Sequence, residues 1–204
     1  MIARLGYNAG MPTPTRDEAW ELVCEWVSAD SLRKHLLGVE AAMRAYAREG
    51  GEDEELWGVT GLVHDLDYER HPDLDDAENG HPRTALRLFA ELGWPQELID
   101  AVAGHATFLD VPRETAMAKT LFAVDELSGF IAACALVRPT GIEGMKPKSV
   151  RKKLKQPSFA AGVNREEVFR GAEELGVEFD EHVAFVIAAI GERADEVGLA
   201  AAER

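Results

Sequence analysis

The 204-residue sequence has two cysteines, almost no strand-like alternation and no apolar run that approaches the roughly 18 to 20 residues of a membrane span. Cys24 and Cys134 both lie in apolar helical patterns, which predicts two small buried residues rather than a disulfide framework or a zinc site. The N-terminal stretch MIARLGYNAGMPTPT lacks a charged region followed by an apolar one, so we expect no signal peptide. These absences together favour a cytoplasmic protein without a membrane span.

Several common catalytic motifs are also missing. The sequence has no Gly-x-Ser-x-Gly elbow, no glycine-rich phosphate loop and no redox pair of cysteines. Basic residues are outnumbered, with 22 Lys and Arg against 37 Asp and Glu and a formal net charge of −15. Because a nucleic-acid backbone binds a basic face, we expect no general nucleic-acid binding. A small phosphorylated ligand would need local positive charge from metal ions or lysines.

Helical periodicity runs through nearly the whole chain and predicts a single all-α domain over residues 1–204. We expect helices over about 15–27, 30–50, 53–65, 82–93, 95–105, 112–137, 164–175 and 180–197. Thr15 with Glu18, and Asn164 with Glu167, have the spacing of capping boxes. The C-terminal helices therefore occupy about residues 164–198.

A basic segment over about residues 141–157 interrupts this pattern, and we expect it to be a loop excursion from the domain. It holds Lys146, Lys148, Arg151, Lys152, Lys153 and Lys155, with no acid after Glu143. In an acidic protein such a cluster can act as a lid that gathers phosphate groups, or it can be a solvated loop that pairs with the acidic body. It has no interleaved aromatic residues for stacking of nucleic-acid bases.

Six side chains that bind divalent cations occur along the predicted helices: His35, His64, Asp65, His81, His105 and Asp125. Most neighbours of Asp125 are apolar, and an unpaired carboxylate buried there would cost several kcal/mol. Each residue taken alone also admits an interpretation as a core histidine, a cap or a surface acid. Their order and shared chemistry favour a metal site.

Mixed imidazole and carboxylate ligands suit Mn, Fe, Ni, Co or Zn rather than an all-oxygen calcium site. Six ligands exceed the four of a structural zinc site. His64 and Asp65 are adjacent, so both reach one ion only near a helix end, where the second oxygen of Asp65 can face another ion. We therefore predict two divalent metals that share Asp65. One is held by His35, His64, Asp65 and Asp125, and the other by Asp65, His81 and His105.

Over about residues 32–137 the chain resembles the HD superfamily of metal-dependent phosphohydrolases. The resemblance rests on HLLGVEAAMRAYA, LVHDLDY, HPRTALRLF, AVAGHA and AVDELSG, in that order. The later stretch KPKSVRKKLKQPSFAAGVNREE is similar to small stand-alone bacterial members. The resemblance implies an HD-domain helical bundle with a core of about residues 31–137, and His81 and His105 resemble the second-metal ligands of some branches. The sequence HDLDYE differs from the many branches that carry Ile-Gly after His-Asp. The resemblance therefore does not imply that the chain shares a substrate with those branches.

The predicted reaction is hydrolysis of a phosphoester or phosphoanhydride, in a nucleotide or another small phosphorylated metabolite, by a metal-activated water. Asp65 and Asp67 are the candidate catalytic carboxylates. Asp67 would orient the water or protonate the leaving group, or would instead be a solvated loop acid. Glu126 either supports Asp125 or is a surface acid. Candidates to bind the substrate phosphate are Lys119, Arg138, Lys146 and Lys148.

Two other functions remain open at this point. The same ligands can hold two irons in a dioxygen-dependent oxygenase of the HD type. Alternatively, the chain could be a non-catalytic nucleotide-binding module, although loss of ligands is its usual sign and all six are present. The sequence also leaves open whether the chain forms a homo-oligomer.

Overall fold

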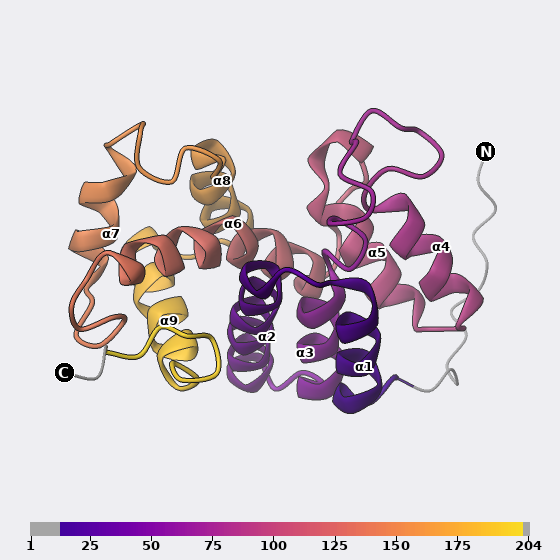
Figure 1. Ribbon diagram of the computed structural model, residues 1–204, viewed down its shortest axis with the longest axis horizontal. Coiled ribbons are helices and arrows are strands. Elements are labelled where there is room, and N and C mark those ends of the chain that lie inside the picture. The colour runs from indigo at the N-terminus through magenta and orange to yellow at the C-terminus, as the bar shows by residue number, and fades with distance from the viewer. Residues whose placement is uncertain (1–12, 202–204) are drawn as a thin grey trace.

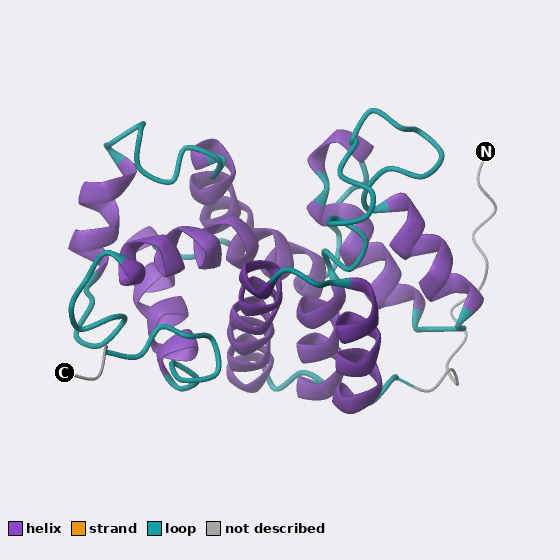
Figure 2. Ribbon diagram, viewed as in Figure 1, coloured by secondary structure: helices purple, strands orange, loops and turns teal. Residues whose placement is uncertain are grey.

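The computed structural model describes residues 13–201, and the regular elements in this part are helices joined by loops (Figure 2). The elements are α1 (Arg16–Trp26), α2 (Asp30–Gly50), α3 (Glu54–Val63), α4 (Arg83–Glu91), α5 (Gln96–His105), the 3-10 helix η1 (Thr107–Leu109), α6 (Ala116–Leu136), α7 (Pro147–Leu154), α8 (Arg165–Leu175) and α9 (Phe179–Gly191). The predicted all-α fold is confirmed for these residues. The segment in which we expect no signal peptide lies largely outside them.

Helix α6 connects the two ends of the molecule. In Figure 1 it runs horizontally, with α4 and α5 near its beginning and α7 near its end. It packs against α2, α5, α7, α8 and α9. Its buried residues point in nearly every direction, as in a helix that is surrounded by others. One cluster of buried apolar side chains reaches from Ala19 in α1 to Leu199 after α9.

Helices α2 and α3 approach each other closely at Gly61. A Cβ atom at this position would lie 2.9 Å from Cγ of Met43 and 3.1 Å from the carbonyl oxygen of Val39. A larger residue would therefore push the two helices apart. The contact lies one turn before His64, so the glycine also sets how close the end of α3 comes to α2.

One of the two predicted capping boxes forms as expected. Thr15 and Glu18 form the expected capping box at the start of α1. Asn164 caps α8 by accepting the backbone N–H groups of Glu166 and Glu167. The carboxylate of Glu167, however, accepts a hydrogen bond from the Thr107 hydroxyl at 2.9 Å. The second motif is therefore a simple N-cap, because the Glu167 carboxylate binds Thr107 instead of the backbone N–H of Asn164.

The basic segment is more ordered than we predicted, because its middle forms α7. Pro147 occupies the first turn of this helix, where its missing N–H costs nothing. Val150 and Leu154, one turn apart, are buried and anchor the helix. The excursion is thus a short basic helix flanked by loops, and it packs against α6 and α9.

One further prediction is wrong, since Cys24 is exposed whereas Cys134 is buried as expected. Helix α1 buries only Ala19 and Val23. Cys24 follows Val23, so its side chain points about 100° away from that buried face. In the part of the chain that is described, no helix has both the length and the apolar character to cross a bilayer.

Candidate metal centre

The six predicted ligands meet where α2, α3, α5 and α6 converge. His35 comes from α2 and Asp125 from α6. His64 and Asp65 directly follow α3, and His105 is the last residue of α5. His81 lies two residues before α4, at the end of the long loop that follows Asp65. Four separate helices and one loop thus place their polar side chains at one point.

The first group of ligands consists of His35, His64 and Asp125. One ligand atom from each lies within 4.8 Å of the others. The Nε2 atoms of His35 and His64 are 3.1 and 3.3 Å from Oδ1 of Asp125. These three residues can therefore share one cation.

The second group consists of Asp65, His81 and His105, again with ligand atoms within 4.8 Å of one another. Oδ1 of Asp65 is 3.3 Å from Nε2 of His81 and 3.4 Å from Nε2 of His105. The two Nε2 atoms are 3.3 Å apart. His81 and His105 are the histidines that we predicted to hold the second metal. This group is therefore a separate candidate position for a cation.

Asp65 lies between the two groups and turns one oxygen to each. Its Oδ2 atom is 3.6 Å from Nε2 of His64 and 4.0 Å from Nε2 of His35. Its Oδ1 atom faces His81 and His105. A carboxylate with this orientation can bridge two cations.

The histidines at the ends of α3 and α5 are held by main-chain carbonyls. Nδ1 of His64 lies 2.8 Å from the carbonyl oxygen of Gly61, and Nδ1 of His105 contacts that of Val102. Both carbonyls belong to the last turn of a helix and have no intrahelical donor. A carbonyl only accepts, so Nδ1 carries the hydrogen and the Nε2 lone pair faces the centre.

The carboxylate of Asp67 orients His81, as the main-chain carbonyls orient His64 and His105. It is fully buried and accepts hydrogen bonds from Nδ1 of His81 at 2.7 Å and from the backbone N–H of Ala85 at 2.8 Å. The alternative interpretation of Asp67 as a solvated loop acid is therefore wrong. Sequence reasoning missed its contact with His81, and only its position two residues after the His-Asp pair drew attention to it.

The donor set fits a divalent transition metal. Nε2 of His64 is buried and has no hydrogen-bond partner, which is unusual for a polar atom in a protein interior. Its lone pair points at the carboxylates, and a cation there would satisfy it. Imidazole nitrogens with carboxylate oxygens are a preferred ligand set for Mn, Fe, Co, Ni and Zn.

The electrostatics of the cluster favour positive charge at its centre. Burial alone would lower the pKa of His64, but the charges of Asp65 and Asp125 outweigh it and raise that pKa to about 9. Burial would also raise the pKa values of the two carboxyl groups, yet the neighbouring His64 charge lowers both below their usual range. A proton on His64 thus occupies the role that a cation would take.

Solvent reaches the centre from one side. The side chains of His35, Asp65 and Asp125 are 20%, 16% and 19% exposed, whereas that of His64 is fully buried. Those of His81 and His105 are 5% exposed. Water and a substrate can therefore approach over the α2 and α6 face, with the second group lying deeper.

The four candidate phosphate-binding cations lie elsewhere. Lys119 precedes Asp125 by six residues on α6, so its side chain points about 120° away from that of Asp125. Arg138 donates to the carbonyl oxygens of Gly141 and Glu143 in the loop after α6. Lys146 and Lys148 are exposed at the start of α7, far from α5 in Figure 1. The structure does not bring these residues to the six ligands.

Glu126 contacts α8 rather than the ligands. Its carboxylate accepts the backbone N–H of Asn164 at 3.2 Å. Burial is the main cause that raises its pKa, to about 7, and the charge of Asp125 adds to the effect. Glu126 therefore ties the ligand-bearing part of α6 to the start of α8.

The described residues form an all-helical fold with a cluster of histidines and aspartates that could hold divalent metals. The family model of the HD domain matches residues 32–129, and this part of the chain belongs to that family. The match contains all six ligands and ends within α6, before α7, α8 and α9. HD domains bind divalent metals, and the family suggests a metal-dependent hydrolase. Searches of curated proteins and of solved structures return no match to the chain.

Proposed function

We propose that the chain is a metal-dependent phosphohydrolase that cleaves a phosphoester or phosphoanhydride of a nucleotide or another small phosphorylated metabolite. The observation that carries the proposal is the placement of Asp65, with one oxygen toward each group of ligands. Asp65 would bridge two cations, with three further ligands in the first group and two histidines in the second, and such a centre would support hydrolysis without a protein nucleophile.

The roles of the chain's own residues follow from their contacts. Two bound divalent cations would supply an acidified water and polarise the phosphoryl oxygens. Asp65 would fix the spacing of the cations. Asp67 is a positioning residue, because it acts through His81 by holding its Nδ1 hydrogen. The buried side, lined by His64, keeps bulk water away from the deep face of the centre.

The substrate is expected to be small. The face over His35, Asp65 and Asp125 is the open one, and none of the candidate cations lies there. The negative charge of the phosphate must then be neutralised chiefly by the bound metals, because the protein as a whole has a net charge of −15. A single phosphorylated metabolite satisfies this better than a polyanion.

The test is a screen of nucleotides and phosphorylated metabolites for phosphate release with added Mn, Co, Ni or Fe. We expect activity that needs the metal and disappears in Asp65→Ala and His64→Ala. His71→Ala is the matched control, since His71 lies in the loop between Asp67 and His81 but outside both ligand groups. It should retain metal and activity.

Three results would reject the proposal. Full activity in Asp65→Ala would rule out a centre that depends on the bridging carboxylate. Two bound irons with substrate-dependent oxygen uptake, and no phosphate release, would instead identify an oxygenase on the same ligands. Nucleotide binding without turnover under any metal would identify a binding module.

A further inference from the structure

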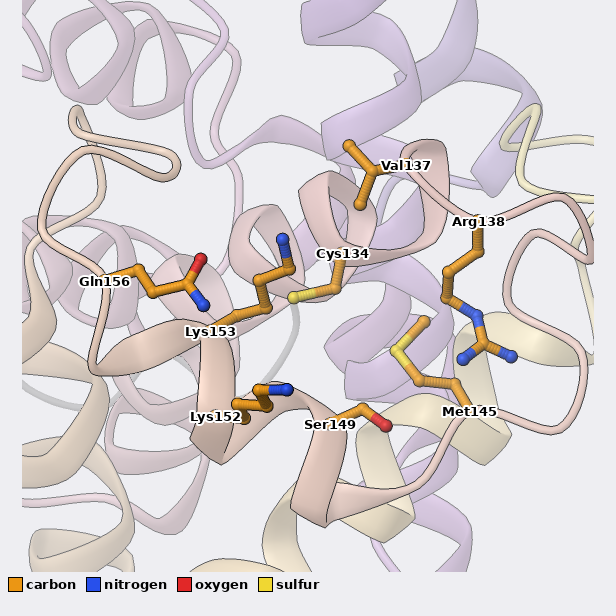
Figure 3. A pocket seen from close by; sticks show the side chains of 8 residues that line it. All are labelled: Cys134, Val137, Arg138, Met145, Ser149, Lys152, Lys153 and Gln156. Atoms are coloured by element: carbon orange, nitrogen blue, oxygen red, sulfur yellow. The ribbon is translucent and has the colours of Figure 1, made fainter.

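A pocket lies between the end of α6 and α7, outside the candidate metal centre. Its volume is about 340 Å³, which is within the usual range for small-molecule sites. Figure 3 shows Cys134, Val137 and Met145 forming an apolar wall, with the side chains of Lys152 and Lys153 beside them. The pocket thus combines an apolar surface with two ammonium groups.

The pocket is separate from the metal centre. Cys134 follows Asp125 by nine residues on α6, which places it about 14 Å further along the helix and about 180° around it. The two sites therefore face opposite sides of α6. A ligand in this pocket cannot contact the six metal ligands.

Positive charge is concentrated around this pocket. Five of the seven lysines of the chain lie in α7 and its flanks: Lys146, Lys148, Lys152, Lys153 and Lys155. No acidic residue occurs over residues 144–165, in a protein of net charge −15. Among residues 13–201, the ion pair formed by this segment joins Arg151 to Asp180, and no ion pair involves its lysines. The charge of these lysines is therefore not neutralised by the protein.

Two of the pocket cations are held in place. Nζ of Lys153 lies 4.2 Å above the ring of Phe159. The guanidinium of Arg138, which also lines the pocket, donates to the carbonyl oxygens of Gly141 and Glu143 at 2.8 and 2.7 Å. Both groups thus keep their charge at the pocket wall without an anionic partner. Ser149 adds a hydroxyl group at the α7 side.

The Cys134 side chain, which lies beside these cations, is uncharged. Cys134 is buried, and burial raises the pKa of its thiol to about 11 although Lys153 and Arg138 act in the other direction. The thiol is therefore neutral at physiological pH and behaves as a small apolar surface. A ligand of matching chemistry would carry an anionic group and an apolar body.

We propose that this pocket binds a small phosphate ester with an apolar body, with its anionic group between Lys152 and Lys153 and its body against Cys134 and Met145. The site is independent of the metal centre and of the reaction there. Helix α7 lies too far from the candidate metal ligands to act on a substrate there, and the proposed site assigns its lysines a binding role.

The experiment uses 8-anilinonaphthalene-1-sulfonate, whose fluorescence rises in apolar surroundings next to cations, with the full-length protein. We expect the probe to bind one site per chain. Phenylphosphonate should displace the probe from this site, and benzyl alcohol should not. The double variant Lys152→Ala/Lys153→Ala should bind the probe at least tenfold more weakly, as loss of charge-assisted contacts predicts. The control Lys148→Ala/Lys155→Ala removes equal charge from exposed positions outside the pocket and should change affinity less than about twofold.

Ser149→Phe separates the cavity from the charge, because it fills the pocket and keeps every lysine. Ser149 is exposed, so the folded structure should tolerate the substitution, and the probe should again bind at least tenfold more weakly. His64→Ala should leave probe affinity unchanged. Equal weakening in both lysine variants, unchanged binding in Ser149→Phe, or loss of binding in His64→Ala would each overturn the proposal. Circular dichroism of every variant confirms that the fold is kept.

Discussion

At the residue scale, the candidate metal centre depends on groups that orient the side chains facing it. Asp67 holds the Nδ1 hydrogen of His81 with Oδ1 and the N–H of Ala85 with Oδ2. In Asp67→Asn the amide oxygen can still bind Ala85, and the amide NH₂ then faces Nδ1. His81 would respond by moving its hydrogen to Nε2, the atom that faces Asp65. That tautomer cannot bind a metal.

We therefore expect Asp67→Asn to weaken binding at the second position roughly 10- to 100-fold and to leave the first position intact. Metal titration with stoichiometry by elemental analysis measures this. Asp75→Asn, an exposed acid of the same loop, is the control. If both variants bind two metals like the unchanged protein, Asp67 has no positioning role.

The two thiols offer a second test at this scale. Cys24 is exposed, whereas Cys134 is buried with a pKa raised to about 11 by that burial. Because the thiolate is the reactive form, an aromatic disulfide reagent at pH 8 should react rapidly with one thiol per folded chain and with two after unfolding. Cys24→Ser should abolish the rapid reaction. A rapid reaction that persists in Cys24→Ser would show that the Cys134 wall of the pocket between α6 and α7 opens readily.

The meeting of the six side chains at the candidate centre was predictable from sequence, because their residue types and order set them apart. Their supporting groups were not. The partner of Asp67 lies 14 residues away across a loop, and the carbonyls of Gly61 and Val102 have no side-chain signature. The four cations were chosen for their charge and, for Lys119 and Arg138, for flanking Asp125 in the sequence, and neither property reports distance to the candidate centre. The direction of Lys119 could have been predicted, because six residues on one helix place its side chain about 120° from that of Asp125.

At the element scale, the position of α6 depends on its contact with α8. A Cβ atom at Gly171 would lie 2.6 Å from Cα of Ala123, two residues before Asp125. This neighbour is backbone and cannot rotate away. The two helices would have to separate, and Asp125 would move with α6.

Gly171→Ala should therefore destabilise the protein by about 1–3 kcal/mol, although alanine is the better helix former. Gly191→Ala in α9 is the matched control, because no atom lies within 4 Å of a Cβ there. It should be neutral or stabilise by up to about 1 kcal/mol. Urea unfolding of both variants measures the difference. Equal stability of the two would show that α6 and α8 can separate at little cost.

Helix boundaries were predicted well where a cap residue marks them and poorly where tertiary contacts decide. Thr115 caps α6, so the helix starts later than the apolar pattern suggested. Helix α7 was missed because its buried face is only Val150 and Leu154, too short a pattern to show periodicity. Helix α9 ends at Gly191 because the chain turns there and brings Leu199 to the core, where its carbonyl accepts the N–H of Ile142.

At the scale of the whole molecule, we expect His64 to couple stability to pH and to metal binding. Without metal, burial alone would lower its pKa, but Asp65 and Asp125 raise that pKa to about 9, above the usual 6.5. A raised pKa in the folded state means that the extra stability is present below about pH 6.5 and is lost as the pH rises through about 9. A metal ligand must be neutral, so cations compete with this proton and bind better as the pH rises.

We therefore expect the metal-free protein to lose stability between about pH 6.5 and 9, and the increase in Tm caused by added Mn²⁺ to grow over the same range. At 100 times the dissociation constant, one bound ion should add about 2.7 kcal/mol to the free energy of unfolding. Thermal unfolding with Mn²⁺ or with a chelator, at a series of pH values, measures both effects. His64→Ala should lose the pH-dependent decline as well as the metal effect, and His71→Ala should keep both. If the loss of stability with rising pH persists unchanged in His64→Ala, the group that loses the proton lies elsewhere in the chain. The pH dependence of stability would then be unrelated to the candidate metal centre.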